Sequence, residues 1–151
     1  MKLISMSHTK LEVSPYGERL WQLVEPCIIS MHTDEGLLTM EVATNFVTDF
    51  RSPRGVLGDL VDVFIPNAGN EEVAVCFLYH DACYTQDMED NHPVSRPLAD
   101  EILFESLKKA GFSDLRAGIV YEAVRNLGEG PWDQSPEWGN ETRWKFDWSD
   151  R

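Results

Sequence analysis

The 151-residue sequence predicts an α+β fold, with a β-rich N-terminal hairpin or meander followed by three helices. Two observations carry this prediction. The first third of the chain contains β-rich apolar runs separated by a polar turn, whereas residues 71–128 repeat apolar side chains with a helical period. We therefore expect a single α+β domain over residues 1–132 and a tryptophan-rich, acidic C-terminal tail over residues 133–151.

The expected hairpin is formed by two runs with high strand propensity. They are residues 20–30 (LWQLVEPCIIS) and 36–46 (GLLTMEVATNF), and the acidic stretch MHTDEG between them is typical of a turn. Residues 1–19 are polar without a clear period, so no element is predicted there. Residues 48–58 contain two glycines and a proline, and this composition indicates a loop.

Three helices are expected, at residues 71–86, 95–110 and 113–127. The caps and stops are Ser95 and Gly111 for the second helix, and Ser113 and Gly128 for the third. Because only a short turn joins the second and third helices, they should pack as neighbours.

The net charge of the chain disfavours some classes of binding partner. Thirteen Lys and Arg residues against 26 Asp and Glu residues give a net charge of -13, which disfavours direct binding of nucleic acid or of an anionic membrane surface. The excess acid is consistent with solubility alone, with a carboxylate-fed metal site or with a DNA mimic. No apolar run is long enough to cross a membrane, and the N-terminus lacks the apolar stretch of a signal peptide. The odd number of cysteines favours free thiols.

Two polar residues fall where apolar ones are expected. His80 lies in the middle of the apolar face of the first helix, and Asp100 shares a stripe with Leu103 and Leu107 on the second. A buried carboxylate needs a partner, so we expect a hydrogen bond between Asp100 and His80. Such a bond orients an imidazole as a base, but it can equally be a structural bridge in the core. Arg96 and Arg125 are further candidate partners for buried or interface carboxylates.

More polar residues accompany this pair. Asp81 follows His80 and points about 100° around the helix, and Tyr84 lies one turn later. Asp49 lies in the loop before the helices. A loop carboxylate, its neighbouring carbonyls and a helix carboxylate together suit calcium. A calcium ion there could hold an ester or phosphate oxygen while the base activates water.

Four segments resemble a family of uncharacterised phage and bacterial proteins. That family has the order D-x-x-S-x-P, then H-D-x-x-Y, then R-x-x-A-D. The segments are VATNFVTDFRSPR (42–54), FLYHDACY (77–84), SRPLADEILFESL (95–107) and AVRNLGEGPW (123–132). The resemblance covers about residues 19–132 and implies a phage-type protein, located in the host cytoplasm or in the virion.

The same order is similar to bacterial phospholipase A-two. This resemblance implies that the first two helices form an antiparallel pair. It also implies catalytic roles for His80 as the base, for Asp100 as the group that orients it, and for Tyr84 in the hydrogen-bond network. The calcium ligands that it implies are Asp49, the carbonyl of Phe50, and Asp81.

Three functions follow as hypotheses. The first is a phage-encoded, phospholipase-A-two-like hydrolase that uses the His–Asp pair, with calcium as cofactor, against a phospholipid or another ester. The second is a non-catalytic phage particle component, in the tail or in assembly, whose partners are other particle proteins. The third is an acidic DNA mimic. Trp132, Trp138, Trp144 and Trp148 suggest a contact with a protein partner or with a membrane interface, unless their rings cover the protein's own core.

Overall fold

The computed structural model describes residues 2–6, 11–13, 21–23, 25–42, 47–48, 76, 79–80, 83, 94–127 and 144–149. The strands are β1 (Lys2–Met6), β2 (Leu11–Val13), β3 (Trp21–Leu23), β4 (Cys27–Thr33), β5 (Gly36–Val42), β6 (Val47–Thr48) and β7 (Trp144–Ser149), and the helices are α3 (Arg96–Lys109) and α4 (Asp114–Leu127). This combination of antiparallel strands and helices confirms the predicted α+β class. The second and third predicted helices correspond to α3 and α4, whereas the first is described at only four helical residues and its antiparallel pairing stays a prediction.

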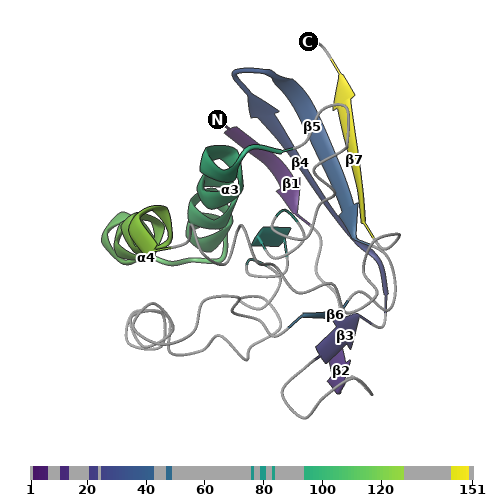
Figure 1. The fold of residues 1–151 in the computed structure, drawn as a ribbon, viewed down its shortest axis with the longest axis horizontal. Helices are drawn as coiled ribbons and strands as arrows, with labels where there is room; N and C mark the ends of the chain where they lie inside the picture. The colour runs from purple at the N-terminus through teal and green to yellow at the C-terminus, as the bar shows by residue number, and fades with distance from the viewer. Residues whose placement is uncertain are drawn as a thin grey trace.

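The main sheet has the strand order β1-β4-β5-β7, and every neighbouring pair is antiparallel (Figure 1). Its centre is the predicted hairpin, in which β4 pairs with β5 from Cys27↔Val42 to Thr33↔Gly36. The turn is shorter than the MHTDEG stretch, because β4 continues to Thr33 and only residues 34 and 35 form the turn. The Thr33 hydroxyl closes the turn by donating to the Gly36 carbonyl at 2.8 Å.

The hairpin has one buried face and one outer face, on which polar residues and Ile28 are exposed. Six side chains on its inner face are fully buried: Cys27, Ile29, Met31, Leu38, Met40 and Val42. On the outer face His32 and Glu41 are exposed, and the hydroxyls of Ser30 and Thr39 are 3.1 Å apart. This alternation is the period-2 pattern of a sheet that buries one side against the core.

Both edges of the main sheet come from segments in which no strand was predicted. β1 pairs with β4 although residues 1–19 show no clear period. β7 pairs with β5 from Val42↔Trp144 to Leu37↔Ser149, so part of the segment expected as a tail is a strand of the sheet. The small second sheet has the order β2-β3-β6.

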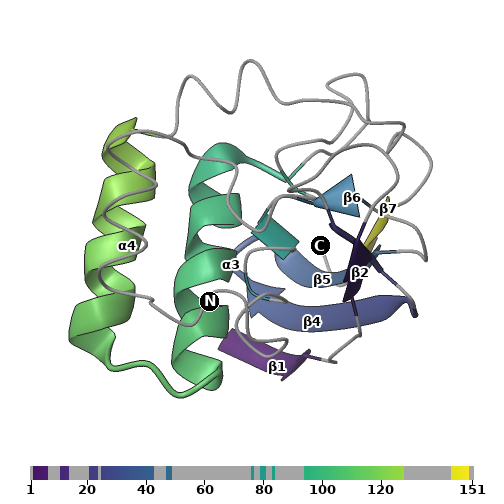
Figure 2. The ribbon, with the colours of Figure 1, turned by 90° about the horizontal axis from the view of Figure 1, so that it is seen from below.

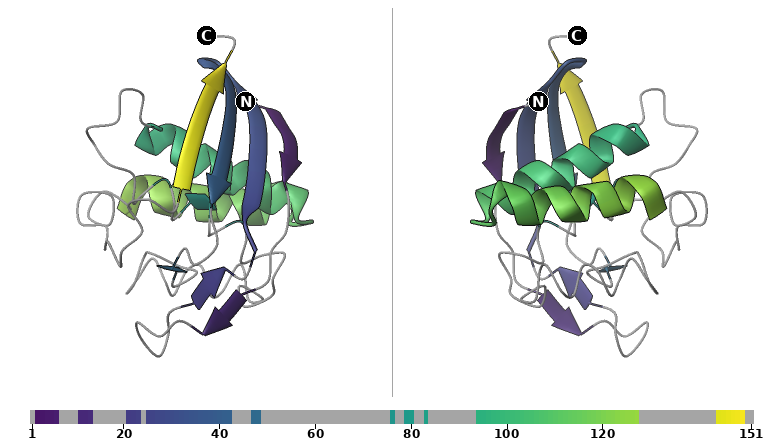
Figure 3. Two further views of the ribbon diagram at one scale, coloured as in Figure 1. Left: turned by 90° about the vertical axis from the view of Figure 1, so that its right-hand side faces the viewer. Right: turned by 90° about the vertical axis from the view of Figure 1, so that its left-hand side faces the viewer.

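The helices form two further layers. α3 lies against the inner face of the sheet and α4 lies on the far side of α3, running antiparallel to it (Figures 2 and 3). α3 is therefore buried on two sides. Leu98, Ala99 and Ile102 pack with the sheet, whereas Leu103 and Leu107 pack with Ala117, Val120 and Val124 of α4.

Three of the four predicted helix ends, Ser95, Gly111 and Ser113, lie in the described part of the chain and are confirmed. The fourth, Gly128, lies outside the described residues. The Ser95 hydroxyl accepts a hydrogen bond from the Leu98 amide at 3.3 Å, and the Ser113 hydroxyl accepts one from the Arg116 amide at 3.2 Å. Gly111 has φ 106°, the left-handed conformation that follows a helix. Neither of these helices has the length and apolar character required to span a bilayer.

Candidate functional site

His80 lies on a helical face that points into the core. Cys76, Tyr79, His80 and Cys83 are helical, and their spacing places them on one side of the helix. His80 is only 2% exposed, whereas the other three are fully buried. Cys76 packs in the cluster between α3 and α4, and Tyr79 and Cys83 pack in the cluster beneath the sheet. The imidazole is thus held between two apolar clusters.

Asp100 of α3 contacts the His80 side chain. It lies in the first half of α3 and is fully buried. His80 Nε2 lies 2.8 Å from Asp100 Oδ1, so the predicted contact is confirmed. With an ionised carboxylate the imidazole donates through Nε2–H, and this bond fixes the ring orientation.

The second oxygen of Asp100 is bound to a cation. Arg125 Nη1 donates to Oδ2 at 2.8 Å, and its side chain is 28% exposed. Arg125 comes from the last turn of α4. A buried carboxylate that is paired on both oxygens avoids much of the cost of a buried charge. The expectation that Arg125 pairs with a buried carboxylate is confirmed.

Arg96 binds the same turn of α4, but through the backbone. Its Nη2 donates to the carbonyls of Val124 at 2.9 Å and of Arg125 at 2.7 Å. The last carbonyls of a helix have no partner within the helix, so Arg96 acts as a side-chain cap for α4. It therefore joins the first turn of α3 to the last turn of α4.

Tyr121 adds a neutral phenol to this region. Its ring packs on Phe104, with centroids 5.5 Å apart. Burial raises the pKa of Tyr121, the negative charge of Glu101 raises it further, and Arg125 acts in the opposite direction. The phenol therefore stays protonated at neutral pH.

All three cysteines are buried thiols outside any disulfide, as the odd number suggested. Burial raises the pKa of the Cys27 thiol from 9.0 to about 12, and it does the same for Cys76. The Cys83 thiol lies 3.7 Å from Met40 Sδ in the core. Because the thiolate is the nucleophilic form, Cys27 and Cys76 are poor candidates for nucleophiles.

Comparison with known proteins identifies the family. A family model described as "Protein of unknown function (DUF1353)" matches residues 21–124. The chain belongs to the DUF1353 family. A search of curated proteins and a search of solved structures each returned no match. The expected membership in an uncharacterised family is confirmed, whereas the similarity to phospholipase A-two stays a prediction.

The DUF1353 match contains most of the polar network. His80, Asp100 and Arg96 lie inside the matched residues, and Arg125 directly follows the last of them. The strands β1, β2 and β7 lie outside the match. The network is thus built almost entirely from the part of the chain that defines the family.

The other predicted site residues lie outside the described part of the chain. They are Asp49, Phe50, Asp81 and Tyr84. Among the residues that the structure does describe, no group of three or more His, Cys, Asp or Glu side chains could hold a metal ion. Calcium binding by this DUF1353 protein therefore stays a prediction from the sequence.

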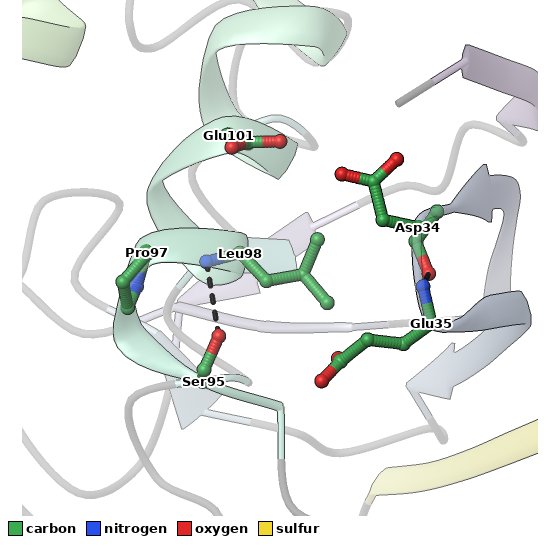
Figure 4. Close-up of a pocket in the computed structure, with 7 residues that line it drawn as sticks. Asp34, Glu35, Ser95, Pro97, Leu98 and Glu101 are labelled. Carbon is green, nitrogen blue, oxygen red and sulfur yellow. Dashed lines mark hydrogen bonds between the residues drawn. The ribbon is translucent and has the colours of Figure 1, made fainter.

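A small pocket lies apart from the His80–Asp100 pair. It measures about 150 Å³ and lies between the β4–β5 turn and the first turns of α3 (Figure 4). Asp34 and Glu35 of the turn and Glu101 of α3 give it a negative lining, and Pro97 and Leu98 give it an apolar part. Neither His80 nor Asp100 lines it. Sequence reasoning identified MHTDEG only as an acidic turn, because the pocket depends on how α3 packs against the sheet.

Proposed function

We propose that this protein is a hydrolase in which His80, oriented by Asp100, activates water for attack on an ester. The observation that carries the proposal is the distance of 2.8 Å between His80 Nε2 and Asp100 Oδ1. A histidine whose one nitrogen is bound to a carboxylate has a defined tautomer, and this arrangement suits a general base. Since Nε2 binds Asp100, Nδ1 is the nitrogen assigned to the reaction.

The proposed reaction is a simple acyl transfer to water. His80 Nδ1 accepts a proton from water while the water oxygen forms a bond to the ester carbonyl carbon. The tetrahedral intermediate then collapses, the ester C–O bond breaks, and the imidazolium returns the proton to the leaving alcohol. Asp100 stays ionised throughout and stabilises the imidazolium through Nε2–H. Tyr84 belongs to the hydrogen-bond network in this proposal.

The finer parts of the proposal come from the resemblance to phospholipase A-two. They are a phage-encoded enzyme, a phospholipid or a related ester as substrate, and a place of action in the host cytoplasm or the virion. Calcium is the proposed cofactor, with Asp49, the Phe50 carbonyl and Asp81 as ligands. A bound cation would neutralise the charge that develops on the carbonyl oxygen.

The test compares two histidines. His80→Ala should lower hydrolysis of a phospholipid or a short-chain ester by about 10²–10⁴-fold, the range for loss of a general base. His32→Ala is the matched control, because His32 is exposed on the outer face of β4 and should leave turnover unchanged. Circular dichroism and thermal unfolding of both variants separate loss of chemistry from loss of fold.

Calcium is tested by adding millimolar calcium or EDTA to the same assays. If Asp81 binds the ion, calcium should raise both turnover and the melting temperature, and Asp81→Asn should abolish both effects. If turnover is present but insensitive to calcium and EDTA, the role of His80 as general base is retained and calcium is rejected as the cofactor.

A second candidate function has its own observation. His80 is 2% exposed, Asp100 is fully buried, and both Asp100 oxygens are bound, as in a structural bridge of a core. In this alternative the protein is a non-catalytic particle component that binds other phage proteins. Absence of hydrolysis on a broad ester panel, with or without calcium, together with unfolding of His80→Ala, would favour it over the enzyme.

A further inference from the structure

We propose that Arg125 is a positioning residue for the His80–Asp100 pair and that Arg96 holds Arg125 in place. The activity part of this inference rests on the proposed function. The geometric part does not, because it concerns only how the imidazole is held.

The carboxylate of Asp100 has torsional freedom that helix packing does not remove. The terminal torsion of an aspartate has broad wells, so packing of α3 alone does not fix the plane of its carboxylate. Two hydrogen bonds in different directions hold the plane of the carboxylate. His80 binds Oδ1 at 2.8 Å and Arg125 binds Oδ2 at 2.8 Å. Loss of the second bond removes one of the constraints on the carboxylate plane, so we expect the bond to His80 to weaken.

Charge supports the same assignment. Asp100 is fully buried, and a buried carboxylate is stable only when its charge is compensated. The Arg125 guanidinium provides the compensating charge at 2.8 Å and remains cationic at all relevant pH values. His80 can then contact an ionised carboxylate whether the ring is neutral or charged.

Arg125 needs support because it lies near the end of a helix. α4 ends at Leu127, and a free arginine side chain has many rotamers. Arg96 donates to the backbone carbonyls of Val124 and Arg125 at 2.9 and 2.7 Å. The turn that carries Arg125 is thereby tied to the start of α3.

The two contacts with α4 come from the same face of α3. Arg96 and Asp100 are four residues apart on this helix, so they lie one above the other. Arg96 binds the backbone at Arg125, and the Arg125 side chain returns to Asp100. Arg96 thus fixes the backbone from which the Arg125 side chain reaches Oδ2.

The experiment observes the imidazole directly. In protein with ¹⁵N-labelled histidine, the Nε2–H proton of His80 should give an NMR signal protected from exchange with water by its bond to Asp100. Arg125→Met keeps a flexible, unbranched apolar stem but removes the donors and the charge of the guanidinium. We expect the exchange of this proton to become about tenfold faster or more, as befits a weakened charge-assisted hydrogen bond, and its chemical shift to move. Arg125→Lys should restore part of the protection.

The matched control is Arg116→Met, since Arg116 is exposed on the same helix. It should leave the His80 signal as in the wild type. Arg96→Met should cause a smaller change of the same kind as Arg125→Met. If Arg96 acts through Arg125, the double variant should be no worse than Arg125→Met alone.

The outcomes separate this inference from the proposed function. With a substrate in hand, Arg125→Met should lower kcat about tenfold with KM unchanged, because the base is misplaced while binding is kept. A wild-type protein without hydrolase activity, but with an Arg125-dependent His80 signal, would reject the enzyme and support the positioning role. A His80 signal that is unchanged in Arg125→Met, or in Arg125→Gln if the methionine variant fails to fold, would overturn the positioning role.

Discussion

Asp100 and His80 are 20 residues apart in the sequence and meet at 2.8 Å in the core. Together with Arg125 they form a polar network that joins the segment containing His80, α3 and α4. Burying any one of these polar side chains without its partners would cost free energy. The contribution of the network to folding stability therefore depends on the carboxylate that His80 and Arg125 share. The stability of the protein should therefore be sensitive to this one side chain.

We expect Asp100→Ala to lower the free energy of unfolding by about 3–5 kcal/mol, as for loss of one partner from a buried charged pair. The change removes the acceptor shared by His80 and Arg125 and leaves a small cavity. Asp100→Asn keeps the shape and one acceptor, so it should cost less. Urea unfolding followed by circular dichroism measures both values.

The control for this prediction is the next residue along the helix. Glu101 is half-buried and lines the acidic pocket, so Glu101→Gln should change stability by no more than about 0.5 kcal/mol. If Asp100→Ala were as stable as Glu101→Gln, the network would contribute little to the fold.

Two glycines should respond in opposite directions to alanine. Gly111 has φ 106°, and a Cβ added there would lie within 4 Å of none of the described residues, so Gly111→Ala is opposed by backbone strain and should cost about 1 kcal/mol. Gly118 is helical, and an added Cβ would lie 3.9 Å from Phe104 in ordinary contact. Gly118→Ala should therefore stabilise by about 0.5–1 kcal/mol. Thermal unfolding of the two variants side by side tests the sign of each effect.

The parts of the fold that sequence reasoning predicted are those with a local cause. Ser95 and Ser113 cap helices because a serine before an apolar period satisfies free amides. The contact between His80 and Asp100 was predictable because each interrupts an apolar helical face, and a buried carboxylate needs a partner.

The parts that were missed depend on long-range packing. β1 and β7 form because the hairpin offers two open edges, and nothing in residues 1–19 or in the tryptophan-rich segment specifies that pairing locally. Which carboxylate Arg125 binds could not be predicted either, because it depends on how the last turn of α4 crosses α3. The double-sided burial of α3 likewise depends on both neighbours being present.

Trp148 distinguishes a core role from a partner role for the C-terminal tryptophans. It is partly buried against the cluster beneath the sheet, and its strand partner is Leu38. Trp148→Ala should therefore destabilise the isolated protein by about 2–4 kcal/mol, somewhat below the cost for a fully buried tryptophan. The exposed neighbour Ser149 is the control, and Ser149→Ala should be nearly neutral. An unfolding midpoint unchanged by Trp148→Ala would instead favour a partner that covers this ring.

The buried thiols make stability depend on pH in the alkaline range. Burial raises the pKa of Cys27 and of Cys76 from 9.0 to about 12. The folded state therefore holds these protons more tightly than the unfolded state. This contribution is fully present below about pH 9 and is lost as the pH rises toward about 12. We expect the free energy of unfolding, measured in urea, to fall between about pH 9 and pH 11.

The control for this pH dependence is the double variant Cys27→Ala/Cys76→Ala. Lysines and tyrosines also titrate in this interval, so the double variant should still lose stability, but with a shallower slope. Equal slopes for the two proteins would show that these thiols do not cause the pH dependence.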